Sequence, residues 1–189
     1  MKNCIIVHGC PSIKEKVIDI EKRTYDKHWI PWIRNKLEEK GFRVEVPLMP
    51  EPWSPKYIVW KKIFDELDIN EETVLVGHSC GGGFLVRWLG DTGKRIRKLI
   101  LVAPAISHSG NYKSLSNLLN FKIDTSIINN VSKAVIFVSN DDSKGILKSV
   151  NLFSEALNIK VIEFRDKGHF TLGDMGTEEF PELLEEVLR

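Results

Sequence analysis

Short apolar runs rich in β-branched residues alternate along the chain with longer segments in which apolar residues recur about every 3.6 positions. Near-continuous apolar runs of this kind are typical of strands that are buried on both faces of a parallel sheet. We interpret the short runs as six strands, at residues 4–8, 42–46, 73–77, 98–103, 134–139 and 160–164. We interpret the longer segments as five helices, at residues 28–41, 57–68, 81–93, 144–158 and 177–189.

This alternation predicts the α/β class: a three-layer sandwich with a mostly parallel sheet of about six strands and helices on both faces. The length of 189 residues and the 42% hydrophobic composition favour a single domain, residues 1–189. Two stretches fit the alternation poorly. Residues 10–27 are rich in charge and residues 104–130 in Ser and Asn, so we expect loops or small lids there, with little or no cap.

Charge narrows the classes of partner, and the cysteine content indicates the state of the thiols. The 27 basic and 26 acidic residues are interspersed and give a net charge of +1, so neither nucleic acid nor a membrane is expected as a partner. The apolar run at the N-terminus is too short for a signal peptide or a membrane span, and we expect a cytoplasmic protein. Cys4, Cys10 and Cys80 are few and odd in number, which favours reduced thiols over a disulfide framework.

Residues 77–81, Gly-His-Ser-Cys-Gly, match the pattern G-x-S-x-G between a predicted strand and a predicted helix, the context of a nucleophile elbow. Such a turn strains the serine backbone and needs the small residues Gly77 and Gly81 on either side. Ser79 would stand at a helix N-terminus, where the amide of Cys80 is a natural oxyanion donor. A glycine-rich turn that only packs closely or binds a phosphate is the alternative that this motif alone leaves open.

A serine nucleophile needs a base that takes its proton and a carboxylate that orients the base. In α/β-hydrolases these residues follow in the order Ser, acid, His. His169 is the only histidine beyond residue 108 and comes just after the last predicted strand, while Asp141 and Asp142 follow the fifth. All three loops lie at the carboxyl edge of the predicted sheet. A surface histidine and helix-capping aspartates are the plainer alternatives.

The first predicted strand ends in Val-His-Gly-Cys-Pro, and the loop there can offer a second oxyanion amide, which we assign to Cys10. We interpret His8 as a buried hydrogen-bonding residue. A zinc site made of His8, Cys10, His78 and Cys80 is an alternative, because these residues form two i, i+2 pairs on strands expected to be neighbours. The elbow redirects Cys80, however, so we expect neither a metal nor a cofactor.

Together these segments resemble the α/β-hydrolase superfamily, in particular the small serine hydrolases similar to retinoblastoma-binding protein nine and its bacterial relatives. The resemblance runs nearly end to end through VHG, HWIPWIRNKLEEKGFRV, MPEPWSPKYIVW, LVGHSCGG, LILVAPA, FVSNDD and GHF. It implies that the first strand lies between the second and third. It also implies that the acid is the second of the two aspartates, Asp142. Residues 10–27 are longer and more charged than the corresponding loop of that family.

These observations lead to the hypothesis of a carboxylesterase-like serine hydrolase that cleaves small acyl esters through Ser79, Asp142 and His169 and an acyl-enzyme intermediate. Thioesters and amides are further candidate substrates. Trp53 and Phe84 are candidate substrate-binding residues, although ordinary core positions are an equally good interpretation. The alternative is a protein-interaction module on a hydrolase scaffold with weak or no turnover, which would have a protein partner.

Overall fold

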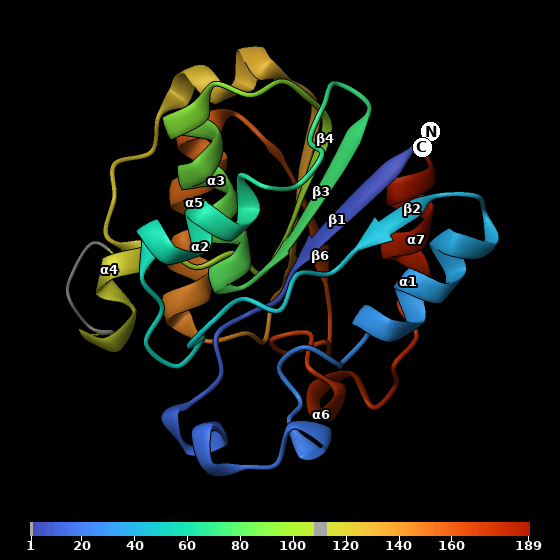
Figure 1. Ribbon diagram of the computed structural model, residues 1–189, viewed down its shortest axis with the longest axis vertical. Helices are drawn as coiled ribbons and strands as arrows, with labels where there is room; N and C mark the ends of the chain where they lie inside the picture. Colours follow the sequence, from blue (N-terminus) through green and yellow to red (C-terminus); the bar gives the residue numbers. More distant parts are fainter. Residues whose placement is uncertain (1, 108–112) are drawn as a thin grey trace.

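The computed structural model describes residues 2–107 and 113–189, and its centre is a six-stranded sheet in the order β2-β1-β3-β4-β5-β6 (Figure 1). All five neighbouring pairs are parallel. The strands are β1 (Asn3–Val7), β2 (Arg43–Glu45), β3 (Thr73–His78), β4 (Ile96–Val102), β5 (Val131–Ser139) and β6 (Lys160–Phe164). The position of β1 between β2 and β3 agrees with the order that the resemblance implied.

Helices cover both faces of this sheet. They are α1 (Ile30–Glu39), α2 (Tyr57–Phe64), α3 (Cys80–Thr92), α4 (Ser116–Leu119), α5 (Lys144–Leu157), α6 (Leu172–Met175) and α7 (Pro181–Leu188). Figure 1 shows α1 and α7 on one face and α2, α3 and α5 on the other. The predicted three-layer α/β sandwich is therefore confirmed.

The central strands are buried because both faces are covered. Every residue of β1 and of β3 is buried, as their near-continuous apolar runs predicted. β4 and β5 begin earlier than expected, since Ile96 pairs with Val131 and extends the ladder into polar sequence. Lys98 of β4 is 1% exposed, and its Nζ lies 3.0 Å from Glu186 Oε1 on α7, so the buried charge has a partner.

The carboxyl ends of the parallel strands meet at one edge of the sheet. Residues 10–27 lie near this edge, whereas residues 104–130 run from it back to the start of β5. Residues 10–27 contain two short 3₁₀ helices, η1 (Ile13–Val17) and η2 (Ile20–Lys22). The stretch 104–130 contains η3 (Lys113–Leu115), α4 and η4 (Thr125–Asn130), while its residues 108–112 lie outside the described residues. Within the described ranges, no helix has the length and apolar character to cross a membrane.

Candidate active site

Ser79 forms the one-residue turn between β3 and α3. Its φ of 52° and ψ of −118° lie in a sparsely populated region for a residue with a side chain. The backbone is held there from both sides. The Ser79 amide donates to the carbonyl of Val102 at 2.9 Å, and the Ser79 carbonyl accepts from the amides of Gly82 and Ala105, both at 3.0 Å. The turn thus has the strained, fully bonded geometry of a nucleophile elbow.

Two glycines allow this turn because backbone occupies the space of a side chain. A Cβ on Gly77 would lie 2.6 Å from Cα of Gly82, and one on Gly81 would lie 2.6 Å from the carbonyl oxygen of His8 and closer still to that of Val7. Neither neighbour is a flexible side-chain end. The requirement for small residues at these two positions, predicted from the motif, therefore has a direct steric cause.

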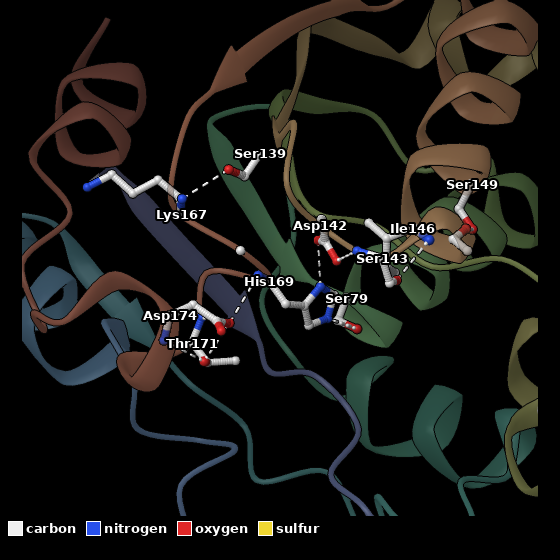
Figure 2. Close-up of polar contacts among 12 residues, drawn as sticks. Ser79, Ser139, Asp142, Ser143, Ile146, Ser149, Lys167, His169, Thr171 and Asp174 are labelled. Atoms are coloured by element: carbon white, nitrogen blue, oxygen red, sulfur yellow. Dashed lines mark hydrogen bonds and ion pairs between the residues drawn. The ribbon is translucent and has the colours of Figure 1, made fainter.

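The three residues that the sequence ordered as Ser, Asp and His meet at the carboxyl edge of the sheet (Figure 2). Ser79 Oγ lies 2.9 Å from His169 Nε2, and His169 Nδ1 lies 2.8 Å from Asp142 Oδ2. Since Nδ1 donates its proton to the carboxylate, Nε2 is left as the acceptor for the Ser79 hydroxyl. The Asp142 side chain is only 3% exposed, whereas that of His169 is 30% exposed, so the imidazole can be reached from outside.

The neighbouring Asp141 faces the backbone of the loop that carries His169. Its Oδ1 accepts from the amide of Gly168 at 3.1 Å and from the hydroxyl of Ser139. The bond from Ser139 is the main cause of the lowered pKa of Asp141. The Ser139 oxygen in turn accepts from the amide of Lys167 at 3.0 Å. The adjacent aspartates therefore differ in partner, because Asp142 faces the imidazole and Asp141 faces the loop backbone.

Two further residues hold the backbone of His169 itself, and sequence reasoning missed both. The amide of His169 donates to Asp174 Oδ2 at 3.0 Å, and its carbonyl accepts from His78 Nε2 at 2.8 Å. Asp174 also forms a capping box with Thr171 at the start of α6. The spacing Thr-x-x-Asp was a readable signal for that cap. The residue types give no signal for the contact of His78 with the His169 carbonyl.

His78 and His8 are both buried and neutral. Burial is the main cause that holds the pKa of His78 well below its ordinary value, and His169 lowers it further; among the described residues, its Nδ1 has no hydrogen-bond partner. Burial likewise lowers the pKa of His8, whose Nε2 accepts from the amide of Met49 at 3.0 Å and whose Nδ1 donates to the Gly9 carbonyl at 2.7 Å. His8 is thus the buried hydrogen-bonding residue that we expected.

The zinc alternative gains no support from the geometry. Both ring nitrogens of His8 are already bonded to backbone, which leaves neither free to ligate a metal. In the part of the chain that the structure describes, no three His, Cys, Asp or Glu side chains are grouped so that they could hold a metal ion.

The two predicted oxyanion residues lie beside Ser79. Cys80 is the first residue of α3, so its amide has no acceptor within the helix. Cys10 lines the same cavities as Ser79, and its thiol interacts with that of Cys80. Burial, followed by this contact, raises the pKa of the Cys10 thiol well above its ordinary value.

Two cavities meet at Ser79 and His169. The first, of about 450 Å³, is bordered by residues of the segment 9–28, which include the polar side chains of Glu15, Thr24 and His28, and by residues 171–173. The second, of about 260 Å³, is bordered by aliphatic side chains; its lining includes Ala105, Ile106, Leu115, Leu119 and Ile146. We call them the polar cavity and the apolar cavity. The serine hydroxyl is therefore open to two different environments.

The model of the serine hydrolase family matches residues 22–188. The chain belongs to the serine hydrolase family. It is similar to serine hydrolase RBBP9 of Rattus norvegicus, with 29% identity over 163 residues and 84% of each chain covered. It is also similar to YdeN of Bacillus subtilis (strain 168), with 24% identity over 159 residues, 82% of this chain and 83% of YdeN.

Solved structures agree with this hydrolase fold. The crystal structure of the ydeN gene product of B. subtilis has a TM-score of 0.82 and 21% identity, with 100% of this chain and 97% of that chain covered. A structure of Est1E from Butyrivibrio proteoclasticus with ferulic acid bound has a TM-score of 0.66 and 12% identity, with 99% and 86% covered. At these identities the likeness concerns the fold.

Two predicted substrate-binding residues of this serine hydrolase lie outside both cavities, which corrects that expectation. Phe84 is fully buried on the inner face of α3, where its ring contacts those of Trp60 and Phe64. Trp53 packs instead under the cationic groups of Lys16 and Arg23, 5.9 and 5.4 Å from its ring centre. The plainer interpretation of Phe84 as core was the correct one, because its position on α3 faces the aromatic side chains of α2.

Proposed function

We propose that this serine hydrolase is a carboxylesterase-like enzyme that cleaves small carboxylic esters, with Ser79 as nucleophile, His169 as base and Asp142 as the orienting acid. The observation that carries the proposal is the continuous chain of hydrogen bonds from Ser79 Oγ through His169 to Asp142, at 2.9 and 2.8 Å. These distances are those required of a nucleophile and its base. The esterase Est1E, a neighbour in fold, adds support for this class.

The proposed reaction begins when Ser79 Oγ attacks the ester carbonyl carbon and passes its proton to His169 Nε2. The C–O bond to the leaving alcohol then breaks, and the alcohol takes the proton from His169. Water, deprotonated by the same nitrogen, attacks the acyl-enzyme and releases the carboxylic acid and free Ser79. Throughout, the Asp142 carboxylate stabilises the imidazolium.

The tetrahedral intermediates need donors for their oxyanion, a role that we assign to the backbone amides of Cys80 and Cys10. The Cys80 amide has the stronger support because it begins α3, where unpaired amides and the helix dipole favour negative charge. An oxyanion donor typically contributes about 10²- to 10³-fold to kcat. The Cys10 thiol, whose pKa is raised, is a protonated bystander at the same place.

We assign the acyl group to the apolar cavity. Two of the polar side chains that border it are already engaged. Ser149 Oγ donates to the carbonyl of Ile106 or Gly145 and accepts from the Ile106 amide. Asp142 Oδ1 accepts from the Ser143 amide (Figure 2). At about 30 Å³ per water-sized group, a volume of about 260 Å³ holds roughly eight such groups. Short acyl chains should therefore be preferred.

Hydrolysis of p-nitrophenyl esters of increasing chain length tests this proposal. We expect turnover of the acetate and butyrate esters, falling with longer chains, and its loss in Ser79→Ala. The exposed serine variant Ser54→Ala is the matched control and should retain activity. If no ester is cleaved and a stable complex with a protein is recovered from cells, the interaction-module alternative is correct instead.

A further inference from the structure

The polar cavity is built largely by the segment 9–28. Glu15 of η1 reaches this cavity and is half-buried there, and its carboxylate accepts from the amide of Thr24 at 3.2 Å. That bond joins η1 to the part of the segment that precedes α1, and the Glu15 carboxylate lies at the cavity wall.

Two cations of the same segment stack on Trp53, which lies outside the cavity lining. Lys16 and Arg23 lie over the ring of Trp53, and Arg23 also donates to the carbonyls of Ile18 and Lys16. Among the residues that line the polar cavity in the described part of the chain, Glu15 carries a full charge and no Lys or Arg is present. Glu15 therefore forms no ion pair among the residues that the structure describes, although Arg23 of the same segment interacts with the hydroxyl of Tyr25 in the same cavity wall.

Two of the imidazoles that line the cavity, those of His28 and His78, have pKa values shifted toward the neutral form. Burial is the main cause that lowers the pKa of His28, and burial also keeps His78 neutral. His28 has a strained backbone with φ of 40°, and its Nδ1 accepts from the amide of Leu172 at 3.1 Å, which fixes the ring at the cavity wall. Tyr25, also buried, adds a second aromatic ring.

On this basis we propose that the polar cavity binds the leaving group of the substrate and selects a cationic one, an ammonium-bearing alcohol or thiol, with Glu15 as its counter-charge. The inference rests on the proposed ester hydrolysis. The two cavities meet at Ser79, and the apolar cavity suits the hydrocarbon of an acyl chain, so the leaving group lies on the side of Glu15, His28 and Tyr25. Aromatic rings next to a carboxylate form a favourable surface for a quaternary ammonium group.

Thioesters with leaving groups of equal size and different charge test this selection. Butyrylthiocholine is cationic, 3,3-dimethylbutyl thiobutyrate is its neutral counterpart, and the thiobutyrate of mercaptoethanesulfonate is anionic. We expect kcat/KM to fall in that order, with a ratio of about ten between the cationic and neutral substrates. In Glu15→Gln this ratio should fall to about one. Glu21→Gln, which removes an exposed carboxylate of η2 that does not line the cavity, should retain the ratio.

Protection of Ser79 from a fluorophosphonate probe supplies a second measurement that does not need turnover. Choline should slow labelling of the parent protein more than 3,3-dimethyl-1-butanol does, and Glu15→Gln should abolish the difference. A charge ratio of one in the parent, or one that Glu15→Gln leaves intact, would overturn the subsite while the hydrolase function stands. Absence of both labelling and turnover would overturn the two proposals together.

Discussion

The two regions that bring the reactive groups together are held in different ways. Steric fit sets the elbow, because Gly81 packs directly on the backbone of β1 and any side chain there would collide with it. Hydrogen bonds from separate elements set the loop that carries His169: Asp141 follows β5, His78 ends β3, and Asp174 belongs to α6. A sterically fixed nucleophile thus meets a base that is held by polar contacts, so the two regions should respond differently to substitution.

The largest effect is expected where the two adjacent aspartates are changed to the same residue. Asp142→Asn removes the charge that holds the imidazole in its tautomer, so kcat should fall about 10³- to 10⁴-fold. Asp141→Asn keeps an oxygen that can accept from the Gly168 amide, so kcat should change about threefold or less. Steady-state ester hydrolysis by the two variants makes the comparison. Equal losses would mean that Asp142 has no special role.

Steric control of the elbow predicts the next largest effect. In Gly81→Ala the new methyl group meets the carbonyls of Val7 and His8, so the elbow must shift from β1. We expect a loss of about 100-fold in kcat/KM and about 1–3 kcal/mol in the free energy of unfolding. Gly173→Ala is the stability control, since the nearest atom to its new Cβ is 3.8 Å away. Urea unfolding of both variants measures these changes in stability. An unchanged free energy of unfolding in Gly81→Ala would refute the steric account.

A smaller effect is expected for a single contact of the His169 loop. Asp174→Ala removes the acceptor for the His169 amide and the partner of Thr171 in the capping box, while the loop keeps its other bonds. We expect kcat to fall about tenfold with little change in KM. The exposed Glu178→Ala nearby is the matched control and should behave as the parent protein. Parallel losses in both variants would point to a general effect of charge at this end of the molecule.

The smallest effect concerns His78, which belongs to the elbow and holds the loop. Its pKa in the folded protein lies well below the ordinary value of 6.5, so below about pH 6.5 the unfolded chain binds more protons than the folded one. Stability should therefore be full above pH 6.5 and fall as the pH is lowered. Urea unfolding at pH 7.5 and 5.5 should reveal a weaker pH dependence in His78→Gln than in the parent. An equal pH dependence of the free energy of unfolding in the two proteins would exclude His78 as its cause.

Much of the fold and the order of the reactive residues could be predicted because they depend on patterns of residue type. Buried parallel strands need apolar runs, and the elbow needs small residues around Ser79. The contacts that fix the His169 loop use backbone amides and carbonyls, which every residue has, so they leave little trace in the sequence. For the same reason the resemblance was needed to separate Asp142 from Asp141.

The cavities were the least predictable feature. An aromatic residue near the end of a strand, such as Trp53, can face the site or stack under neighbouring cations, and the choice depends on how residues 10–27 fold. That segment was expected to form a loop or lid from its charge alone. Its role as the wall of a cavity that contains Glu15 depends on tertiary contacts, including the bond to Thr24.

The central claim is that Ser79 is a nucleophile whose proton is taken by His169. The most direct test is the mass of the protein after a brief reaction with p-nitrophenyl butyrate that is quenched with acid, followed by peptide mapping. The account predicts one butyryl group on Ser79, none in Ser79→Ala, and much slower acylation in His169→Asn. An adduct on Cys10 or Cys80, or acylation of Ser79 at an unchanged rate without His169, would contradict it.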